Sequence, residues 1–199
     1  EKEFNMPFTS KPYLPEVLDI ENDDDLIKAV TSFSWSPFVF SGYRRQDTFI
    51  STDFMVLDID SNLTIEQAEK RVIDLGYTCL CVPTTNHSNE SHRFRLVFPL
   101  SSTIYNSEAY KLTATKLFEL FPEADKSCVT DTARCYFGST LNDGFWLEGG
   151  MIKPVKPKRS EKDNRVDLLK RKVIVAEDIK TTINEIFGDV EEIPECVDY

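Results

Sequence analysis

The chain has few of the features that would place it in a membrane or in an oxidising compartment. No apolar run among its 199 residues is long enough to cross a bilayer. No signal-peptide pattern follows Glu1, and because the chain does not begin with Met we expect a fragment. Its five cysteines include no Cys-x-x-Cys pair. An odd number without such a pair argues against a disulfide framework and favours a reducing compartment.

The chain also lacks the excess of basic residues that proteins coating nucleic acid carry. Its net charge is −11, unevenly distributed. Residues 1–150 carry 13 basic and 23 acidic side chains, residues 151–172 carry 9 and 3, and residues 173–199 carry 1 and 8. This balance argues against a nucleic-acid coat, but not against an enzyme that holds nucleic acid in one local groove.

Helical and strand patterns alternate with short loops, which predicts an α+β layered domain. We divide the chain into an N-terminal arm (1–21), a domain (22–150), a basic linker (151–172) and an acidic helical tail (173–199), which we expect to be part of a longer element. The expected elements are a helix from Asp23, strands within 36–60 around a turn at Gly42, a helix over 64–75 ending at Gly76, a strand over 77–82, a strand over 93–100 ending near Pro99, a helix over 107–121 capped by Ser107, and a short helix over 176–187.

The segment Phe54-Met55-Val56-Leu57-Asp58-Ile59-Asp60 is the most informative one. Alternate residues of a strand share a face, so Asp58 and Asp60 should project together while Leu57 and Ile59 face the other way. Two neighbouring carboxylates repel each other and are costly to desolvate. A divalent cation would remove that cost, so the segment predicts a metal site.

Two further blocks carry chemically useful residues. A polar loop contains Thr85 and His87, and on the following strand Arg93 and Arg95 share a face, as a phosphate receptor would require. The alternative is that these arginines form the solvated face of an edge strand.

The third block, Asp125 to Arg134, follows an apolar helix. Asp131 competes with Asp125 for the role of third acid, and we prefer Asp125 because it follows the apolar stretch. Arg134 is either a site residue or an ion-pair partner of Asp131. Arg44 and Arg45, after Gly42, are candidates for template contact.

Three carboxylates can hold two divalent cations, which would clamp a phosphoryl group for in-line displacement. Arginine and histidine around them would neutralise a triphosphate. The three blocks together therefore favour nucleotidyl transfer.

The order of these blocks resembles the archaeo-eukaryotic primase superfamily, in particular the primase-polymerases of phages, plasmids and mobile elements. The matching motifs are Asp58/Asp60, Thr85-Asn86-His87 and Asp125 after Ala124, and the resemblance covers roughly 50–140. It implies an RRM-like antiparallel sheet with a second αβ module and the active site in the cleft between them. It further implies that Asp58, Asp60 and Asp125 bind Mg²⁺ or Mn²⁺, and that His87 contacts the phosphates of the incoming nucleotide.

The partners implied by the resemblance are nucleoside or deoxynucleoside triphosphates, single-stranded or primed DNA, and a replicative helicase domain. The implied location is the cytoplasm of a prokaryotic host, and no membrane partner is expected. Two other functions are weighed against this one. A replication-initiator nuclease needs two histidines flanking one hydrophobic residue, and His87 and His92 are too far apart for it. A non-catalytic module that binds nucleotide or nucleic acid would carry the acids for structural reasons alone.

Overall fold

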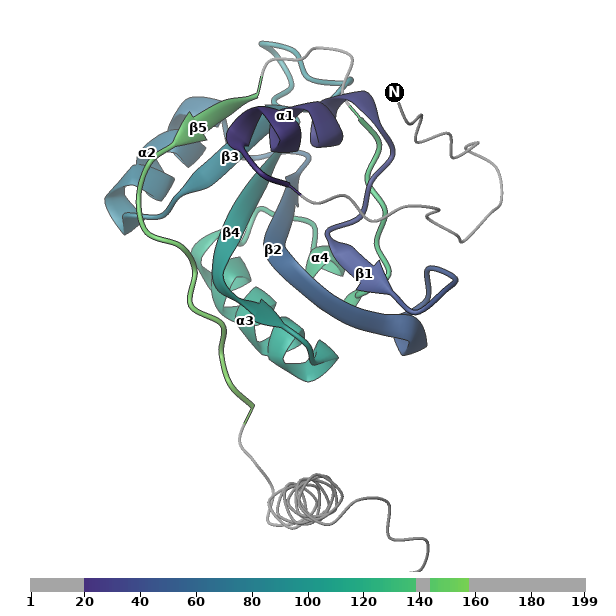
Figure 1. Cartoon of the computed structure of the whole chain (residues 1–199). Helices are drawn as coiled ribbons and strands as arrows, with labels where there is room; N and C mark the ends of the chain where they lie inside the picture. The colour runs from purple at the N-terminus through teal and green to yellow at the C-terminus, as the bar shows by residue number, and fades with distance from the viewer. Residues whose placement is uncertain (1–19, 139–143, 158–199) are drawn as a thin grey trace, which may run out of the picture. The chain divides into compact units, whose positions relative to one another are not determined.

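The computed structural model describes residues 20–138 and 144–157 (Figure 1). The chain divides into two compact units, 1–157 and 158–199, and all described residues belong to the first. Most of the predicted arm and basic linker, and the whole acidic tail with its expected helix, lie outside the described residues.

The predicted α+β class is confirmed by a five-stranded antiparallel sheet. Its strand order is β1-β2-β4-β3-β5. Every strand of the described residues belongs to this sheet, so the second αβ module implied by the resemblance has no separate sheet there. The strands are β1 (Phe38–Phe40), β2 (Phe49–Ile59), β3 (Cys79–Pro83), β4 (Phe94–Ile104) and β5 (Phe145–Leu147).

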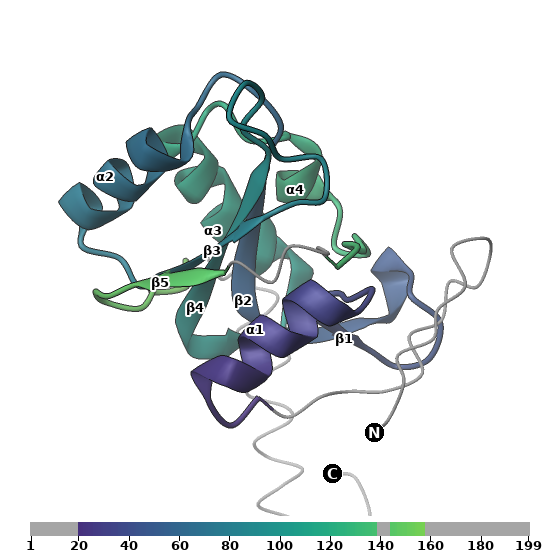
Figure 2. The ribbon, with the colours of Figure 1, turned by 90° about the horizontal axis from the view of Figure 1, so that it is seen from above.

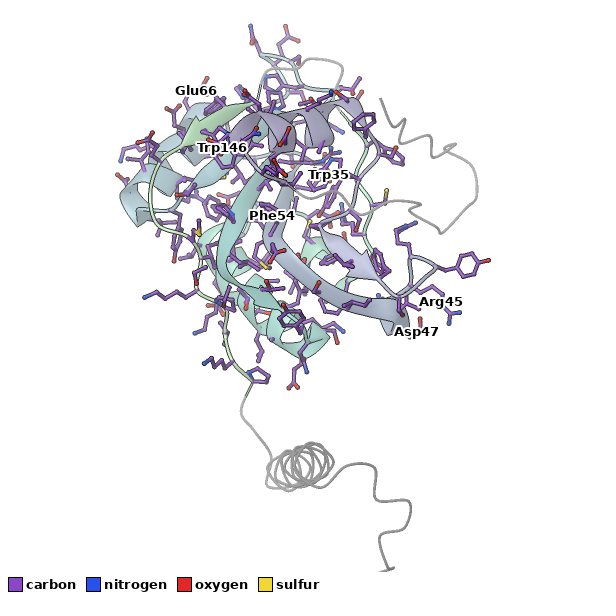
Figure 3. The ribbon with its side chains drawn as sticks, viewed as in Figure 1. Trp35, Arg45, Asp47, Phe54, Glu66 and Trp146 are labelled. Atoms are coloured by element: carbon purple, nitrogen blue, oxygen red, sulfur yellow. The ribbon has the colours of Figure 1, made fainter. Side chains whose placement is uncertain are left out.

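Helices cover both faces of the sheet. Figure 2 shows α1 (Asp23–Ser32) on one side and α2 (Ile65–Leu75) and α3 (Ser107–Leu120) on the other. Each face therefore has its own apolar core, and on the α1 side Trp35, Phe54 and Trp146 pack around it (Figure 3). None of the helices in the described residues is both long and apolar enough to span a membrane. The remaining short helices are α4 (Ser127–Thr130) and the 3₁₀ turn η1 (Gln46–Thr48).

The ends of the helices follow from local hydrogen bonding. Thr64 and Gln67 form a capping box at the start of α2, and Gly76 ends that helix in a left-handed conformation, with φ of 70°. The prediction that Ser107 caps α3 is wrong. The cap is Asn106, whose side-chain oxygen accepts hydrogen bonds from the N–H groups of the first turn.

The prediction that the strand after residue 93 stops near Pro99 is also wrong, since β4 continues to Ile104. Pro99 lies opposite Phe54, next to an irregularity in the β2–β4 register, and a proline is tolerated where the ladder is interrupted. The Pro99 carbonyl accepts a hydrogen bond from the N–H of Ile152 at 3.0 Å. The chain therefore stays in contact with the sheet beyond residue 150.

Candidate functional site

The site is built at the end of strand β2. Leu57 and Ile59 pack in the core shared with α2 and α3, while Asp58 faces the α1 side and is only 9% exposed. Asp60 follows the strand and is exposed. The alternation predicted for this strand is confirmed, and it leaves the two acids in very different surroundings.

Backbone contacts bring Asp125 to the end of β2. Ala124 forms an isolated antiparallel bridge with Ile59, and the N–H of Asp125 donates to the carbonyl of Asp58 at 2.8 Å. These bonds fix the segment after α3 against the last residues of β2. Asp58 and Asp125, which the sequence assigned to one site, are therefore neighbours in space.

The two arginines at the start of β4 each face one acid at the end of β2. Arg95 is the register partner of Asp58, and its Nε lies 3.3 Å from Oδ1 of that carboxylate. Both side chains are almost fully buried. Arg93 lies 3.6 Å from Asp60, and both of these side chains are substantially exposed. The two arginines share a face as predicted, and here they serve as counter-ions of the acids.

Arg134 bridges Asp58 and Asp125. Its Nη2 lies 3.1 Å from Oδ2 of Asp58 and 2.8 Å from Oδ2 of Asp125, and its Nη1 donates to the hydroxyl of Ser127. The suggested pairing of Arg134 with Asp131 is thus wrong. Asp131 instead accepts hydrogen bonds from the N–H of Ala133 and the side chain of Gln46, which ties it into the loop.

Tyr136 supports both buried arginines. The guanidinium carbons of Arg95 and Arg134 lie 5.1 Å and 5.3 Å from the centre of its ring, within the range of cation–π attraction. Backbone hydrogen bonds with Trp35 hold Tyr136 in place. Sequence reasoning missed Tyr136, because its pairing with Trp35 joins segments that no local pattern connects.

Ser127 orients Asp125. The N–H of Ser127 donates to Oδ1 at 2.9 Å and its hydroxyl donates to Oδ2 at 2.7 Å. Burial alone would raise the pKa of Asp125, but these hydrogen bonds and the one from Arg134 outweigh it and lower the pKa. The spacing Asp-x-Ser is typical of such a turn and was a usable signal in the sequence.

The predicted nucleotide-contacting loop lies beside this site with its histidine already engaged. Nδ1 of His87 accepts a hydrogen bond from the N–H of Arg93 at 3.2 Å, and its ring packs edge-on against His92. His92 accepts from the N–H of Ile65 at the start of α2, which gives it a structural role. The hydroxyl of Thr85 is 3.5 Å from the carbonyl of Gly138.

The two arginines after Gly42 differ in their contacts. Arg44 donates to the carbonyl of Ala133, so it fastens the β1–β2 loop to the segment that carries Arg134. Arg45 is exposed and pairs with Asp47 at the turn (Figure 3). Neither contact tests the predicted role in binding a template.

The carboxylates at this site already have a cationic partner. The sequence predicted a divalent cation that relieves the repulsion between Asp58 and Asp60, whereas the structure pairs these acids with Arg95 and Arg93. Arg134 in turn pairs with both Asp58 and Asp125. No group of three or more His, Cys, Asp or Glu in the described residues is arranged to hold a metal. Two carboxylates nevertheless suit Mg²⁺ or Mn²⁺, since Mg²⁺ is often bound through one or two carboxylates together with the phosphates of a substrate.

Comparison with known proteins returned a family and one solved structure. The model of the VapE N-terminal domain family matches residues 17–148. The structure is the AEP domain of the primase-polymerase of cyanophage S-2L, at 12% identity and a TM-score of 0.39, covering 57% of this chain and 60% of that one. It is of the type that the sequence motifs resemble, but a likeness this low indicates neither a shared site nor a shared activity. No curated protein matched.

Proposed function

The chain belongs to the VapE N-terminal domain family, and on that premise we propose that it is a catalytic domain of primase-polymerase type that copies DNA using nucleoside triphosphates. One observation carries the proposal. The Asp125 N–H donates to the Asp58 carbonyl, so that two carboxylates from distant segments converge on the guanidinium of Arg134.

In this proposal Asp58 and Asp125 would hold a divalent cation, and Asp60, just after β2, would be a further ligand. The ion would supply charge neutralisation at the phosphates and activation of the attacking hydroxyl. The 3′-oxygen of a primer forms a bond to the α-phosphorus, the bond from that phosphorus to the bridging oxygen breaks, pyrophosphate leaves, and the hydroxyl proton passes to solvent.

The basic side chains around the acids would bind the triphosphate. Arg93, just before β4, is more exposed than Arg95. Its ion pair with Asp60 is long, at 3.6 Å, and exposed, so it is a weak pair that phosphate oxygens could replace. Because Nδ1 of His87 accepts a hydrogen bond, the neutral ring carries its proton on Nε2, which would donate to a phosphate. Thr85 adds a hydroxyl in the same loop.

The neutralised acids favour a second candidate, a non-catalytic module that binds nucleotide or single-stranded DNA. Its acids would serve only as partners of Arg95 and Arg134. The two candidates differ in their need for metal. A binding module should retain its ligand in the presence of a chelator and should transfer no nucleotide.

Primer extension on a single-stranded DNA template, with Mg²⁺ or Mn²⁺, separates the candidates. Asp125→Asn is the informative variant, because it keeps an oxygen for the Ser127 N–H and should fold. Asp53→Asn is the matched control, since Asp53 also lies on β2 but bonds Thr103 on the exposed surface at 2.6 Å. We expect extension by the wild type and by Asp53→Asn, and a loss of about 100-fold in Asp125→Asn. Metal-independent binding without extension would favour the module.

A further inference from the structure

Arg134 occupies the place at which the two carboxylates converge. A single nitrogen, Nη2, contacts Oδ2 of Asp58 and Oδ2 of Asp125. A divalent cation shared by these two oxygens would need that same place. Arg134 and the cation therefore exclude each other.

Both carboxylates would remain oriented without Arg134. Asp58 keeps the hydrogen bond from Arg95 to its Oδ1. Asp125 keeps the bonds from the backbone and hydroxyl of Ser127. The contacts of Arg134 with both Oδ2 atoms and with the Ser127 hydroxyl would be released. Oδ2 of Asp125 would still accept the hydrogen bond from the Ser127 hydroxyl, and its second lone pair would be open to a cation.

Besides the two carboxylates, Arg134 contacts the hydroxyls of Ser36 and Ser127 and the ring of Tyr136. The Ser36 hydroxyl holds the backbone, since it donates a hydrogen bond to the Arg134 carbonyl at 2.8 Å. Its guanidinium lies against the face of Tyr136, a contact that attracts a cation without demanding one in-plane orientation. A planar guanidinium also binds phosphate oxygens in pairs.

We propose that Arg134 is an exchangeable counter-ion, which closes the carboxylate pair to divalent cations until the triphosphate draws its guanidinium onto the phosphates. The inference rests on the proposed function and adds a regulation of the same site. It makes Arg134 a competitor of the metal and a ligand of the nucleotide. Replacing Arg134 should therefore raise the affinity for the divalent cation and lower the affinity for the triphosphate. Replacing a merely structural residue would lower both affinities.

The test measures binding and not turnover. Mn²⁺ affinity is read from the electron paramagnetic resonance signal of the free ion without nucleotide. Affinity for a fluorescent deoxynucleoside triphosphate is read by anisotropy with a chelator present. We expect Arg134→Gln to bind Mn²⁺ about tenfold more tightly and the triphosphate about tenfold more weakly than the wild type. Arg134→Lys, which keeps the charge, should bind Mn²⁺ as the wild type does.

Arg71→Gln is the matched control, because Arg71 forms a two-fold ion pair with Glu123 away from the carboxylate pair. It should change neither affinity. Unchanged or weaker Mn²⁺ binding by Arg134→Gln would overturn the proposal, as would unchanged triphosphate binding. If that variant does not fold, ¹⁵N spectra of the wild type replace it. The Arg134 Nε signal should shift with triphosphate, and a signal that does not move would overturn the proposal.

These readouts are independent of catalysis. A wild type that extends no primer would count against the proposed function alone. Opposite changes in the two affinities would still support the exchange at Arg134.

Discussion

The buried carboxylate of Asp58 should stabilise the fold, and the variant Asp58→Asn measures how much it contributes to the free energy of unfolding. Its side chain is 12% exposed, and it faces Arg95 at 10% and Arg134 at 19% exposure. Asparagine keeps the shape and one acceptor oxygen but removes the charge. Arg134 would keep Asp125, whereas Arg95 would lose its anionic partner.

Removing one partner of a buried ion pair costs about 3–5 kcal/mol. Because asparagine still accepts one hydrogen bond, we expect the lower end, about 3 kcal/mol in the free energy of unfolding. For a chain of this size, 1 kcal/mol corresponds to about 2–4 °C, so the melting temperature should fall by about 6–12 °C.

Asp60→Asn is the paired control, since the side chains of Asp60 and Arg93 are 56% and 41% exposed and 3.6 Å apart. An exposed pair of this kind contributes at most about 1 kcal/mol. Urea unfolding followed by circular dichroism gives both free energies. The reasoning is refuted if Asp58→Asn lies within about 1 kcal/mol of the wild type, or if Asp60→Asn is destabilised as much as Asp58→Asn.

Three further predictions concern single positions. The hydrogen bond from Arg71 lowers the pKa of Glu123 from 4.5, so this carboxylate stabilises the fold fully above that pH and less as the pH falls through the lowered pKa. In urea unfolding, the free energy of unfolding of Glu123→Gln should therefore fall less steeply below pH 4.5 than that of the wild type. Gly76→Ala should cost about 1–2 kcal/mol by thermal unfolding, because φ is 70° although nothing lies within 4 Å of an added Cβ; an unchanged midpoint would contradict this. Asp131→Asn should extend primers at the wild-type rate, and a loss equal to that of Asp125→Asn would reverse our choice of third acid.

Much of the fold was predictable from local signals. Thr64 with Gln67 marks the start of α2, Gly76 marks its end, and the alternation of Leu57 and Ile59 with the acids orients β2. The extent of β4 was not predictable, because proline is tolerated at residue 99 only through a register irregularity that depends on the partner strand.

The closeness of the selected acids and arginine was predictable, and their ion pairing was not. The sequence selected Asp58, Asp125 and Arg95, and the structure brings them together. The role of Arg134 depends on how the segment after α3 crosses β2 and on the bridge between Trp35 and Tyr136. Such long-range contacts have no period or motif in the chain, so the ion-pair partner of Arg134 could not be chosen from spacing alone.

Arginine at this site changes the physical argument for a metal. Neighbouring carboxylates need a cationic partner, and for Asp58 and Asp125 the guanidinium of Arg134 supplies it. The carboxylate pair is therefore a metal site only if the guanidinium leaves, and the proposed activity requires that the substrate brings about this change.

The most direct test of the central claim is the rate of single-nucleotide incorporation on primed single-stranded DNA by wild type and Asp125→Asn, each with Mn²⁺ and with chelator. We predict incorporation by the wild type with Mn²⁺ only, and a rate about 100-fold lower in the variant. Incorporation by a folded Asp125→Asn at the wild-type rate, or by the wild type in chelator, would contradict it.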